Sequence, residues 1–421
     1  MSSRPDVLVI GAGAAGLVAA LFAAREGARV LVLESTRKGG KKIVVSGGGR
    51  CNVLPSRLDP SRYVTGSSPR TMSRMLLAWP LDEQRAFFEH DLGVPLALEP
   101  ETGKLFPRSN RATDVRDALV GAASRAGASF EFNTRVTGLA PESMGWRIAS
   151  ADKEWTASHV VVATGGLSVP KTGSDGFGLG AARRTGHAMT PTYPALTPLL
   201  AGGGGAAPHA GLSGVSLEAH IHAPAGKRGI QTTGGFLFTH RGYSGPSVLD
   251  VSHLTTLARE RGEAQHVLVR WSRRDADAWA GTFRQPGSGL VLSSLREALP
   301  NRLAEALLEE AGVPADRSRA ELRKDERKRL VRLLTRYPLP WTGDEGYKKA
   351  EVTGGGVALG EVDPVTLESR RQPGLFFCGE VLDAFGPIGG YNFCWAWSTG
   401  RSAGLGAARH VPSTRAGGTG P

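Results

Sequence analysis

The most constraining feature of this chain is an uncharged run at residues 7–24 that three glycines interrupt. Gly11, Gly13 and Gly16 separate a short β-branched segment from an alanine-rich one. This spacing between a strand and a helix is typical of the first strand and helix of a buried parallel sheet. A membrane span would show no such pattern, and the short, mixed sequence before the run does not suit a signal peptide. We therefore expect an α/β protein with a Rossmann-like sheet.

The same segment fits the binding of a dinucleotide. Gly11 permits a tight turn, Gly13 lets a pyrophosphate approach the backbone, and Gly16 lets the helix pack closely on the strand. The N–H groups at the start of the helix, those of Ala14 and Ala15 among them, favour a phosphate. A glycine-rich turn without a ligand is the alternative.

An acid after the second predicted strand narrows the choice of ligand. Glu34 follows a strand at 30–33 and can accept hydrogen bonds from ribose hydroxyls, which favours FAD or NAD over NADP. Ser35 and Val136 are also predicted to contact the cofactor.

Since no C-x-x-C exists among the three cysteines, dithiol reductase chemistry is excluded.

Two further segments favour FAD over NAD. A predicted strand at 160–163 ends in Ala163, Thr164, Gly165 and Gly166, and a strand-like segment at 374–378 is followed by Gly379, Glu380 and Asp383. Together these turns are typical of flavoproteins of the two-dinucleotide type, in which the late acid, here Asp383, typically meets the ribityl chain. The FAD domain would then be assembled from both ends of the chain.

Several specific strings occur in one order along the chain. They are at 40–43, 46–52, 104–109, 172–178, 194–199, 235–246, 350–356, 379–383 and 389–392. In this order and spacing the chain resembles the HI0933-like flavoprotein family over nearly its whole length. The resemblance implies an FAD-dependent oxidoreductase that reduces activated C=C bonds. Branches of the family act on uridine in large-subunit ribosomal RNA or on bile-acid enones, and an aminoacetone oxidase has also been assigned.

The resemblance and a change of pattern near residue 192 also imply a domain organisation. We expect a Rossmann-like FAD-binding domain, an inserted β-barrel domain, a small helical subdomain with helices at 293–311 and 320–335, and a flexible tail. The expected boundaries are 1–191 and 350–409 for the FAD-binding domain, 192–272 and 337–349 for the barrel, 273–336 for the helices, and 410–421 for the tail.

Two glycine-rich loops are predicted to lie against the cofactor. The first joins cationic residues to three successive glycines, which let the backbone pass close to a ligand. The second precedes a helix at 393–403, whose N-terminal N–H groups can stabilise negative charge on reduced flavin. A flexible surface loop and an ordinary helix start are the respective alternatives. The residues concerned are Lys41, Lys42, Ser46, Gly47, Gly48, Gly49, Arg50, Cys51 and Asn52 in the first, and Gly389, Gly390, Tyr391 and Asn392 in the second.

Saturation of a C=C bond needs hydride on one carbon and a proton on the other. Cys51, His240 and Tyr391 are the candidate proton donors. A buried inert cysteine and a structural histidine are the alternative interpretations of the first two.

Half of the net charge of +12 lies in one segment. Residues 317–336 hold nine Lys and Arg against three acids, and Arg319, Arg323 and Arg327 recur every four residues. We expect a basic helix that faces phosphates, with ribosomal RNA as the partner. A solvated arginine-rich helix is the alternative.

Three functions remain open. The first is reduction of a C=C bond, with uridine in ribosomal RNA as the favoured substrate and NAD(P)H as the electron donor. NAD(P)H would bind only transiently, because no second strand–GxGxxG–helix unit exists to hold it. The second is a small-molecule oxidase or dehydrogenase for amines or enones. The third is a flavin-bearing RNA-binding protein without turnover. No second apolar run approaches 18 residues, so we expect a cytoplasmic protein with no membrane contact. Three cysteines cannot form a four-ligand zinc site, and no metal is expected. The oligomeric state stays open, with a monomer favoured.

Overall fold

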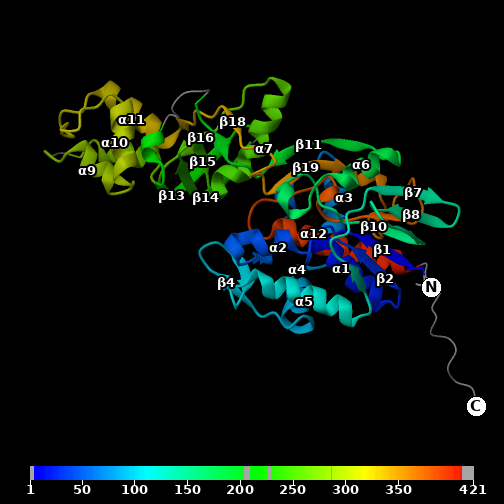
Figure 1. The fold of residues 1–421 in the computed structure, drawn as a ribbon. Helices are drawn as coiled ribbons and strands as arrows, with labels where there is room; N and C mark the ends of the chain where they lie inside the picture. Colours follow the sequence, from blue (N-terminus) through cyan, green and yellow to red (C-terminus); the bar gives the residue numbers. More distant parts are fainter. Residues whose placement is uncertain (1–3, 203–208, 226–228, 286, 410–421) are drawn as a thin grey trace, which may run out of the picture. The chain divides into compact units, whose positions relative to one another are not determined.

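The computed structural model describes residues 4–202, 209–225, 229–285 and 287–409. The chain forms two compact units: unit 1 comprises Met1–Thr192 and Val352–Pro421, and unit 2 comprises Tyr193–Glu351 (Figure 1). The flexible tail expected at 410–421 lies outside the described residues. None of the described helices is both long and apolar enough to cross a membrane.

A five-stranded parallel sheet forms the centre of unit 1, in the order β20-β10-β1-β2-β6. Its strands are β1 (Val7–Ile10), β2 (Val30–Leu33), β6 (Ser129–Glu131), β10 (His159–Val162) and β20 (Leu375–Phe377). Strands β1 and β2 are apolar throughout, as expected for a parallel sheet that is covered on both faces. The Rossmann-like α/β fold is therefore confirmed, and β20 brings the far end of the chain into the same sheet.

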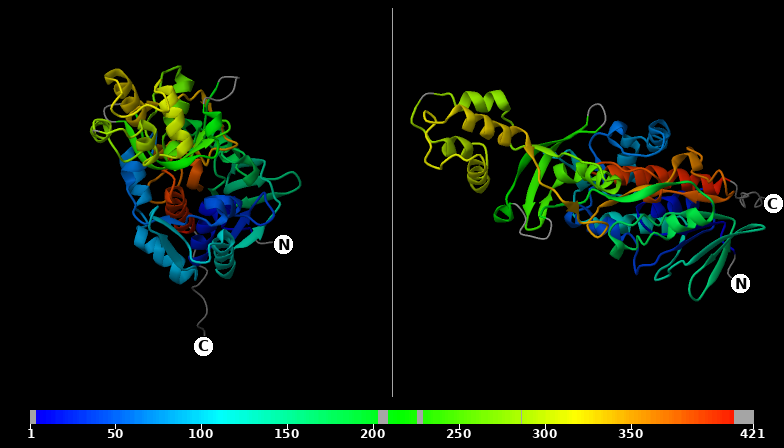
Figure 2. Two further views of the ribbon diagram at one scale, coloured as in Figure 1. Left: turned by 90° about the vertical axis from the view of Figure 1, so that its left-hand side faces the viewer. Right: turned by 90° about the horizontal axis from the view of Figure 1, so that it is seen from above.

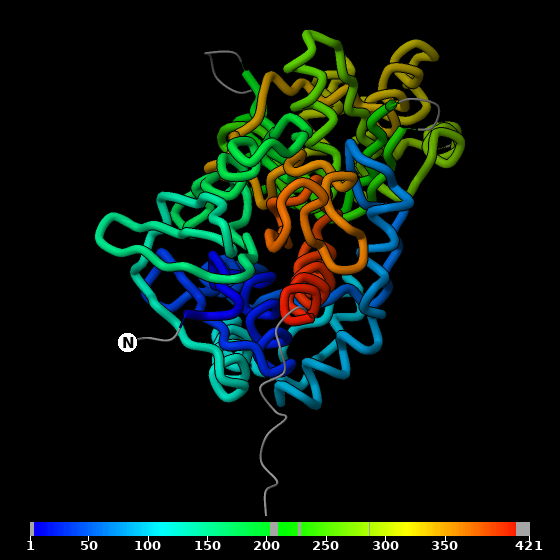
Figure 3. Tube along the Cα trace, turned by 90° about the vertical axis from the view of Figure 1, so that its right-hand side faces the viewer, coloured from blue at the N-terminus to red at the C-terminus, as the bar shows by residue number. Residues whose placement is uncertain are grey.

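The described part of unit 1 contains seven α-helices. They are α1 (Ala14–Arg25), α2 (Lys41–Val45), α3 (Pro69–Leu76), α4 (Leu81–Ala86), α5 (Ala112–Arg125), α6 (Phe177–Arg184) and α12 (Tyr391–Ala408). In Figure 3 the red α12 lies beside the blue N-terminal segment. A Cβ at Gly400 would lie 2.4 Å from the carbonyl oxygen of Ala15, and one at Gly404 would lie 2.3 Å from that of Ala19. The two glycines thus let α12 contact the backbone of α1 directly.

Smaller sheets complete unit 1. Two antiparallel three-stranded sheets and one strand pair are present, and the strand pair carries the chain out of unit 1 and back into it. The strands are β3 (Leu54–Pro55), β4 (Leu96–Glu99), β5 (Lys104–Pro107), β7 (Gly138–Glu142), β8 (Gly145–Ala149), β9 (Glu154–Ala157), β11 (Met189–Ala195) and β19 (Val352–Val357). The sequence did not predict the β7–β9 meander.

Unit 2 contains a seven-stranded antiparallel sheet in the order β17-β16-β13-β14-β15-β12-β18. The strands are β12 (Leu199–Leu200), β13 (Ser216–Ala223), β14 (Ile230–Thr239), β15 (Gly242–Ser244), β16 (Leu268–Arg270), β17 (Tyr337–Pro338) and β18 (Gly343–Asp344). Strands β17 and β18 end the sheet on opposite sides and do not pair with each other among the described residues. The expected closed barrel is therefore not confirmed.

Unit 2 also holds a long helix that the sequence analysis missed, α7 (Pro246–Arg261). Its buried positions include Ser252, His253 and Thr256, so the apolar periodicity that marks most helices is absent. A signal was nevertheless present, because Pro246 occupies the first turn and Gly262 ends the helix with φ of +67°.

Four short helices gather at one end of unit 2 (Figure 2). They are α8 (Ala276–Thr282), α9 (Val291–Arg296), α10 (Asn301–Glu310) and α11 (Lys324–Thr335). The helix expected at 293–311 is two helices, because Pro300 lacks an N–H and cannot lie within one. The helix expected at 320–335 begins only at Lys324, where the N–H of Arg323 donates to Glu326 at 2.9 Å.

Candidate functional site

The turn between β1 and α1 has one open side. A Cβ at Gly11 would lie 2.7 Å from the carbonyl oxygen of Ala163, and one at Gly16 only 1.9 Å from that of Gly11. Gly13, in contrast, has no heavy atom within 4 Å of such a Cβ. Packing therefore requires two of the glycines, and the third faces space that a ligand can occupy.

The start of α1 presents backbone donors to that space. Gly13 is the N-terminal cap and makes no side-chain capping bond, and the first helical bond is donated by Leu17 to Gly13 at 2.9 Å. The N–H groups of Ala14, Ala15 and Gly16 precede that bond, so they are the unpaired donors found at a helix start. This arrangement fits a phosphate.

Glu34 lies directly beside the turn. Its carboxylate is 7% exposed and accepts hydrogen bonds from the N–H groups of Ala12 and Thr36, each at 2.7 Å. The hydroxyl of the exposed Ser35 is 3.4 Å away. Val136 is buried two residues beyond Thr134, whose N–H donates to the Glu34 carbonyl. The anchored carboxylate retains lone pairs that fit the hydroxyls of a ribose.

The first glycine-rich loop follows α2 and has a left-handed backbone. Gly47, Gly48 and Gly49 have φ of +56°, +67° and +86°, a region that glycine enters without strain. A Cβ at Gly48 or Gly49 would meet nothing within 4 Å. The loop, which begins at Ser46, thus exposes backbone that another molecule can approach closely.

Arg50 ends this loop but is already engaged. Its guanidinium donates to Glu99 at 3.1 Å and lies 4.0 Å from the ring centre of Phe106. Hydrogen bonds from Thr102 and Arg50 lower the pKa of Glu99, so the pair stays charged near neutral pH. Arg50 therefore holds the loop against β4 and β5.

Cys51 follows in a strained position. It is fully buried, and its φ of +60° is unusual for a residue with a side chain. Burial raises the pKa of its thiol to about 12, despite a hydrogen bond with Ser46. A thiol this weakly acidic is poorly matched to proton donation near neutral pH.

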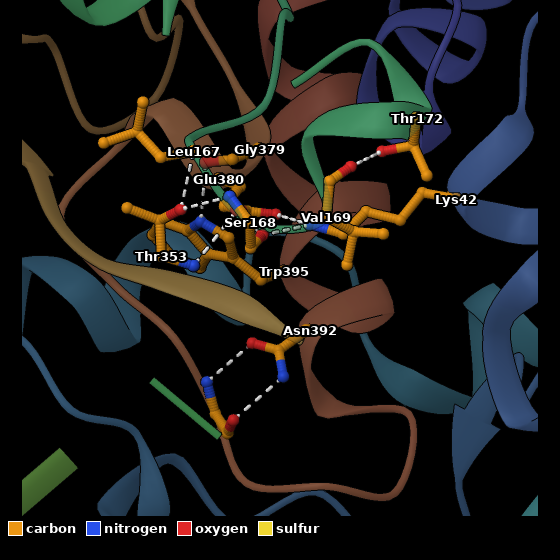
Figure 4. A network of polar contacts seen from close by, with 11 residues as sticks. Lys42, Leu167, Ser168, Val169, Thr172, Thr353, Gly379, Glu380, Asn392 and Trp395 are labelled. Atoms are coloured by element: carbon orange, nitrogen blue, oxygen red, sulfur yellow. Dashed lines mark hydrogen bonds and ion pairs between the residues drawn. The ribbon is translucent and has the colours of Figure 1, made fainter. Parts of the chain in front are cut away.

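The lysines of α2 are not free for phosphate. Lys41 donates to the carbonyl of Lys171 at 2.5 Å. Lys42 donates to Glu380 at 2.5 Å and to the hydroxyl of Ser168 at 2.6 Å (Figure 4). Lys42 is thus the cation of a partly buried ion pair that joins α2 to the turn after β20.

Glu380 is the centre of this network. Its other carboxylate oxygen accepts from Ser168 at 2.6 Å and from the N–H of Thr353 at 3.0 Å. The Thr353 hydroxyl in turn accepts from the N–H groups of Leu167 and Ser168. A Cβ at Gly166 would lie 2.3 Å from Thr353 and 2.9 Å from Glu380, so the turn after β10 packs on the network. The sequence analysis missed Ser168 and Thr353, although Thr353 lies in the string at 350–356.

The turns after β10 and β20 are fixed by neighbouring elements. Gly165 (φ +70°) has Ser174 beside it, and Gly379 (φ +77°) leaves no room for a Cβ, which would lie 2.8 Å from Ala15. Gly379 accepts from the Trp395 indole at 3.0 Å and donates to Thr399 of α12 at 2.9 Å. The turn that carries Glu380 is therefore held against the start of α1. Thr164, between Ala163 and Gly165, completes this region.

Asp383 points to a different neighbourhood. Its buried carboxylate accepts from the hydroxyls of Ser67 at 2.7 Å and Thr190 at 2.8 Å, and from the N–H of Gly66 at 3.3 Å. Of the two late acids, the structure places Glu380 beside the glycine turns. The contact of Asp383 with a ribityl chain stays a prediction.

The second glycine-rich loop is closed by Asn392. Its side-chain amide accepts from the N–H of Gly386 and donates to the carbonyl of the same residue, both at 2.9 Å (Figure 4). Asn52, with its amide oriented to satisfy both neighbours, accepts from the N–H of Gly390 at 3.1 Å and donates to Leu54 at 3.3 Å. Asn52 thus ties the two glycine loops together. Gly389 precedes Gly390 in the second loop and has φ of +119°.

Tyr391 starts α12 with its phenol held on both sides. The Arg62 guanidinium donates to the phenol oxygen at 3.1 Å and lies 5.0 Å from the ring centre, and the phenol donates to the Arg57 carbonyl at 3.1 Å. The Tyr63 hydroxyl donates to the Tyr391 carbonyl at 2.6 Å, and burial raises the pKa of Tyr63 well above its usual value. His240, the third candidate proton donor, is exposed between β14 and β15 of unit 2.

This geometry defines unit 1 as a Rossmann-type domain suited to a dinucleotide cofactor. Residues 5–406 match the family described as "HI0933-like protein Rossmann domain". The chain therefore belongs to the HI0933-like family, and it is a flavin-dependent oxidoreductase.

Two similar proteins match nearly end to end. The "Ribosomal RNA dihydrouridine synthase" of Escherichia coli (strain K12) is 33% identical over 398 residues, which cover 94% of this chain and 96% of that protein. The "3-dehydro-bile acid delta(4,6)-reductase" of Clostridium scindens is 33% identical over 408 residues, which cover 95% and 98%.

A solved structure shares the fold. The 3-ketosteroid delta1-dehydrogenase from Sterolibacterium denitrificans matches with a TM-score of 0.51 at 13% identity, covering 97% of this chain and 100% of that chain. This likeness concerns the fold alone.

Proposed function

We propose that this enzyme reduces an activated C=C bond, and that its substrate is uridine in large-subunit ribosomal RNA. The observation that carries the proposal is the pair of full-length relatives at 33% identity, because both names describe the hydrogenation of an unsaturated compound. The basic segment of unit 2 favours the RNA over the bile acid.

The residues of unit 1 fit FAD as the cofactor. The open side of Gly13 and the donors at the start of α1 suit its pyrophosphate, and Glu34 suits its adenosine ribose. Lys42 and Ser168 hold Glu380 at the turns where the flavin half would lie. When bound, FAD would supply the hydride for the substrate carbon.

NAD(P)H is the proposed electron donor and would visit the flavin transiently. The only strand–GxGxxG–helix unit in the described residues is the one between β1 and α1. The other glycine-spaced stretch, at 176–180, opens α6 after a loop rather than a strand. A second resident nucleotide therefore has no fingerprint to hold it.

Tyr391 is the proposed proton donor. Its phenol already has a hydrogen-bonding guanidinium beside it, and Arg62 would stabilise the negative charge that proton transfer leaves on the oxygen. Cys51 is less suited, because burial raises the pKa of its thiol to about 12. His240 is exposed on unit 2.

Reoxidation of the reduced flavin tests these roles. We expect Tyr391→Phe to slow reoxidation by an RNA substrate at least about a hundredfold, as loss of a general acid does, while Cys51→Ala keeps the parent rate. The flavin spectrum of each variant serves as the control for folding. A slow Cys51→Ala and an unchanged Tyr391→Phe would reverse the assignment.

The proposed substrate is tested in cells lacking the gene. Nucleoside mass spectrometry of their large-subunit RNA should show loss of dihydrouridine, which the parent gene restores and Gly13→Ala, chosen to lower flavin binding, does not. Unchanged dihydrouridine would contradict the proposal.

A bile-acid-like enone is the second candidate, because the reductase of Clostridium scindens matches at the same identity. The two are separated by mixing anaerobically reduced enzyme with either a ribosomal RNA transcript or a steroid enone. Reoxidation by the enone alone would favour the second candidate.

A further inference from the structure

The structure divides the basic segment at 317–336 into two groups of charges. The first group surrounds its acids. Glu326 is fully buried and pairs with Arg323 at 2.7 Å and Arg317 at 3.6 Å, and Asp325 pairs with Arg329 at 2.9 Å. The third acid, Glu321, accepts from the Ser318 hydroxyl at 2.8 Å. These acids are therefore satisfied locally.

The hydrogen bonds around these acids keep them ionised. The hydrogen bond from Arg323 lowers the pKa of Glu326, and the one from Arg329 lowers the pKa of Asp325. Because their charge is used within the segment, they do not cancel the cations that remain.

The second group forms a row on one face of α11. Lys324, Lys328, Arg332 and Arg336 follow one another at intervals of four residues, and all four are exposed. Arg336 lies just past the helix, where its N–H donates to the carbonyl of Arg332 at 2.8 Å and its backbone leaves the helical conformation, with φ of −147°. Within the described residues, none of the four side chains makes a hydrogen bond or an ion pair.

This row is not the face that the sequence predicted. Arg319 and Arg323 precede α11, so only Arg327 of the predicted three lies on the helix. The buried row is Glu326, Leu330 and Leu334, offset by two residues from the exposed row and hence on nearly the opposite side.

We infer that the row Lys324–Lys328–Arg332–Arg336 binds the phosphate backbone of the RNA substrate, an inference that rests on the proposed function. Successive members are about 6 Å apart along the helix and the row spans about 18 Å. No acid interrupts it and no aromatic side chain belongs to it, so the row suits phosphates rather than stacked or paired bases.

A variant of the full-length holoenzyme tests the inference. Lys324, Lys328, Arg332 and Arg336 are all changed to Gln, which keeps the helix propensity. The probes are a transcript of large-subunit ribosomal RNA and an unrelated structured RNA of the same length, and the dissociation constant is measured over a range of salt. Melting temperature and flavin absorbance report on folding.

We expect the variant to bind both RNAs at least about tenfold more weakly, with a salt slope smaller by about 2 to 3. A matched variant changes four other exposed cations to Gln: Arg70, Arg74, Arg183 and Arg261. It should lose much less affinity, because its charge change is equal but scattered.

Three results would overturn the inference. The first is an affinity for RNA and a salt slope that do not change in the variant. This result would count against the inference even if an acidic protein bound the parent and not the variant, since the row would then bind protein rather than RNA. The second is an equal loss in the matched variant. The third is a loss confined to the ribosomal transcript, which would mean that bases are read. If the parent binds RNA through the row but cells lacking the gene keep their dihydrouridine, the proposed function fails while the row stands.

Discussion

The two units use charge in opposite ways. In unit 1, Lys42 pairs with Glu380 and donates a hydrogen bond to Ser168, so its charge is not available to a ligand. The groups of unit 1 that face open space are backbone groups of its glycines. In unit 2, Glu326 and Asp325 of the α11 segment form ion pairs with neighbouring arginines, and a row of cations remains exposed. Unit 1 therefore presents neutral donors in a fixed geometry, whereas unit 2 presents exposed cationic side chains on a surface.

This difference corresponds to two kinds of ligand. A dinucleotide held by backbone N–H groups needs close approach and little reorganisation, which glycines provide because they carry no Cβ. A polyanion held by long side chains needs charge density but little shape, and its affinity depends on salt. Substitutions at the glycine turns and the Lys42–Glu380 pair of unit 1 should thus change cofactor content, stability or both, while substitutions in the α11 row should change neither.

The largest effect is expected at the turn after β1. Gly16→Ala would place a Cβ 1.9 Å from the carbonyl of Gly11, so backbone must shift, and we expect a loss of about 3 kcal/mol or more in unfolding free energy. Flavin should be absent from the purified protein. Urea denaturation and the flavin absorbance of the purified protein measure the two effects.

Gly13→Ala is the matched control. Gly13 has φ of −78° and open space around the added Cβ, so the apoprotein should keep its stability while its affinity for FAD falls. Full flavin content in Gly13→Ala would show that the open side of the turn does not face the cofactor.

The ion pair of unit 1 is expected to have the next largest effect. Removing one partner of a buried pair costs about 3–5 kcal/mol, and since the Lys42 side chain is 29% exposed we expect about 2 kcal/mol for Lys42→Met. Arg147→Gln, which breaks the exposed pairs with Glu142 and Glu154, should cost less than about 1 kcal/mol. Equal losses in urea denaturation would remove the distinction between buried and exposed charge.

The sequence predicted the elements of unit 1 better than their side-chain partners. Strand–turn–helix patterns with fixed glycines are local, so β1, α1, β2 and the turns after β10 and β20 could be anticipated. Partners depend on contacts between distant segments. Nothing local indicated that Lys42 would meet Glu380, 338 positions away, rather than a phosphate.

Unit 2 was predicted less well because its signals are weaker. The buried face of α7 is rich in Ser and Thr, and Pro300 divides what looked like one helix. The basic segment was found, but not its exposed row, because the fold decides which of its cations pair with the acids. A helix that begins at Lys324 rather than at 320 also leaves Arg319 and Arg323 outside it.

Alkaline pH should destabilise unit 1 through its thiols. Burial raises the pKa of Cys51 from 9.0 to about 12, and it also raises the pKa values of Cys378 and Cys394. Above pH 9 the unfolded chain loses these protons while the folded chain keeps them, so stability falls as pH rises. Each thiol contributes a slope of up to about 1.4 kcal/mol per pH unit.

Cys51→Ala isolates one of these contributions. The variant keeps the Cβ at the strained φ of +60°, so its stability should fall less steeply than that of the parent between pH 9 and about 12. Parallel unfolding curves for the two proteins would mean that the thiol is not buried, and would reopen its role as a proton donor.

The smallest effect is expected within α11, where Glu326→Gln and Arg332→Gln separate the two groups of charges. The hydrogen bond from Arg323 lowers the pKa of Glu326, so the stability it adds is present above about pH 4.5 and is lost as pH falls further. Glu326→Gln should lower the melting temperature by a few degrees near pH 7, on the order of 1 kcal/mol for a unit of this size. That difference should narrow below pH 4.5.

Arg332→Gln should leave the melting temperature unchanged at every pH and weaken RNA binding only. If instead Arg332→Gln destabilised the protein as much as Glu326→Gln, the exposed row would be part of the fold, and the contrast between the units would fail.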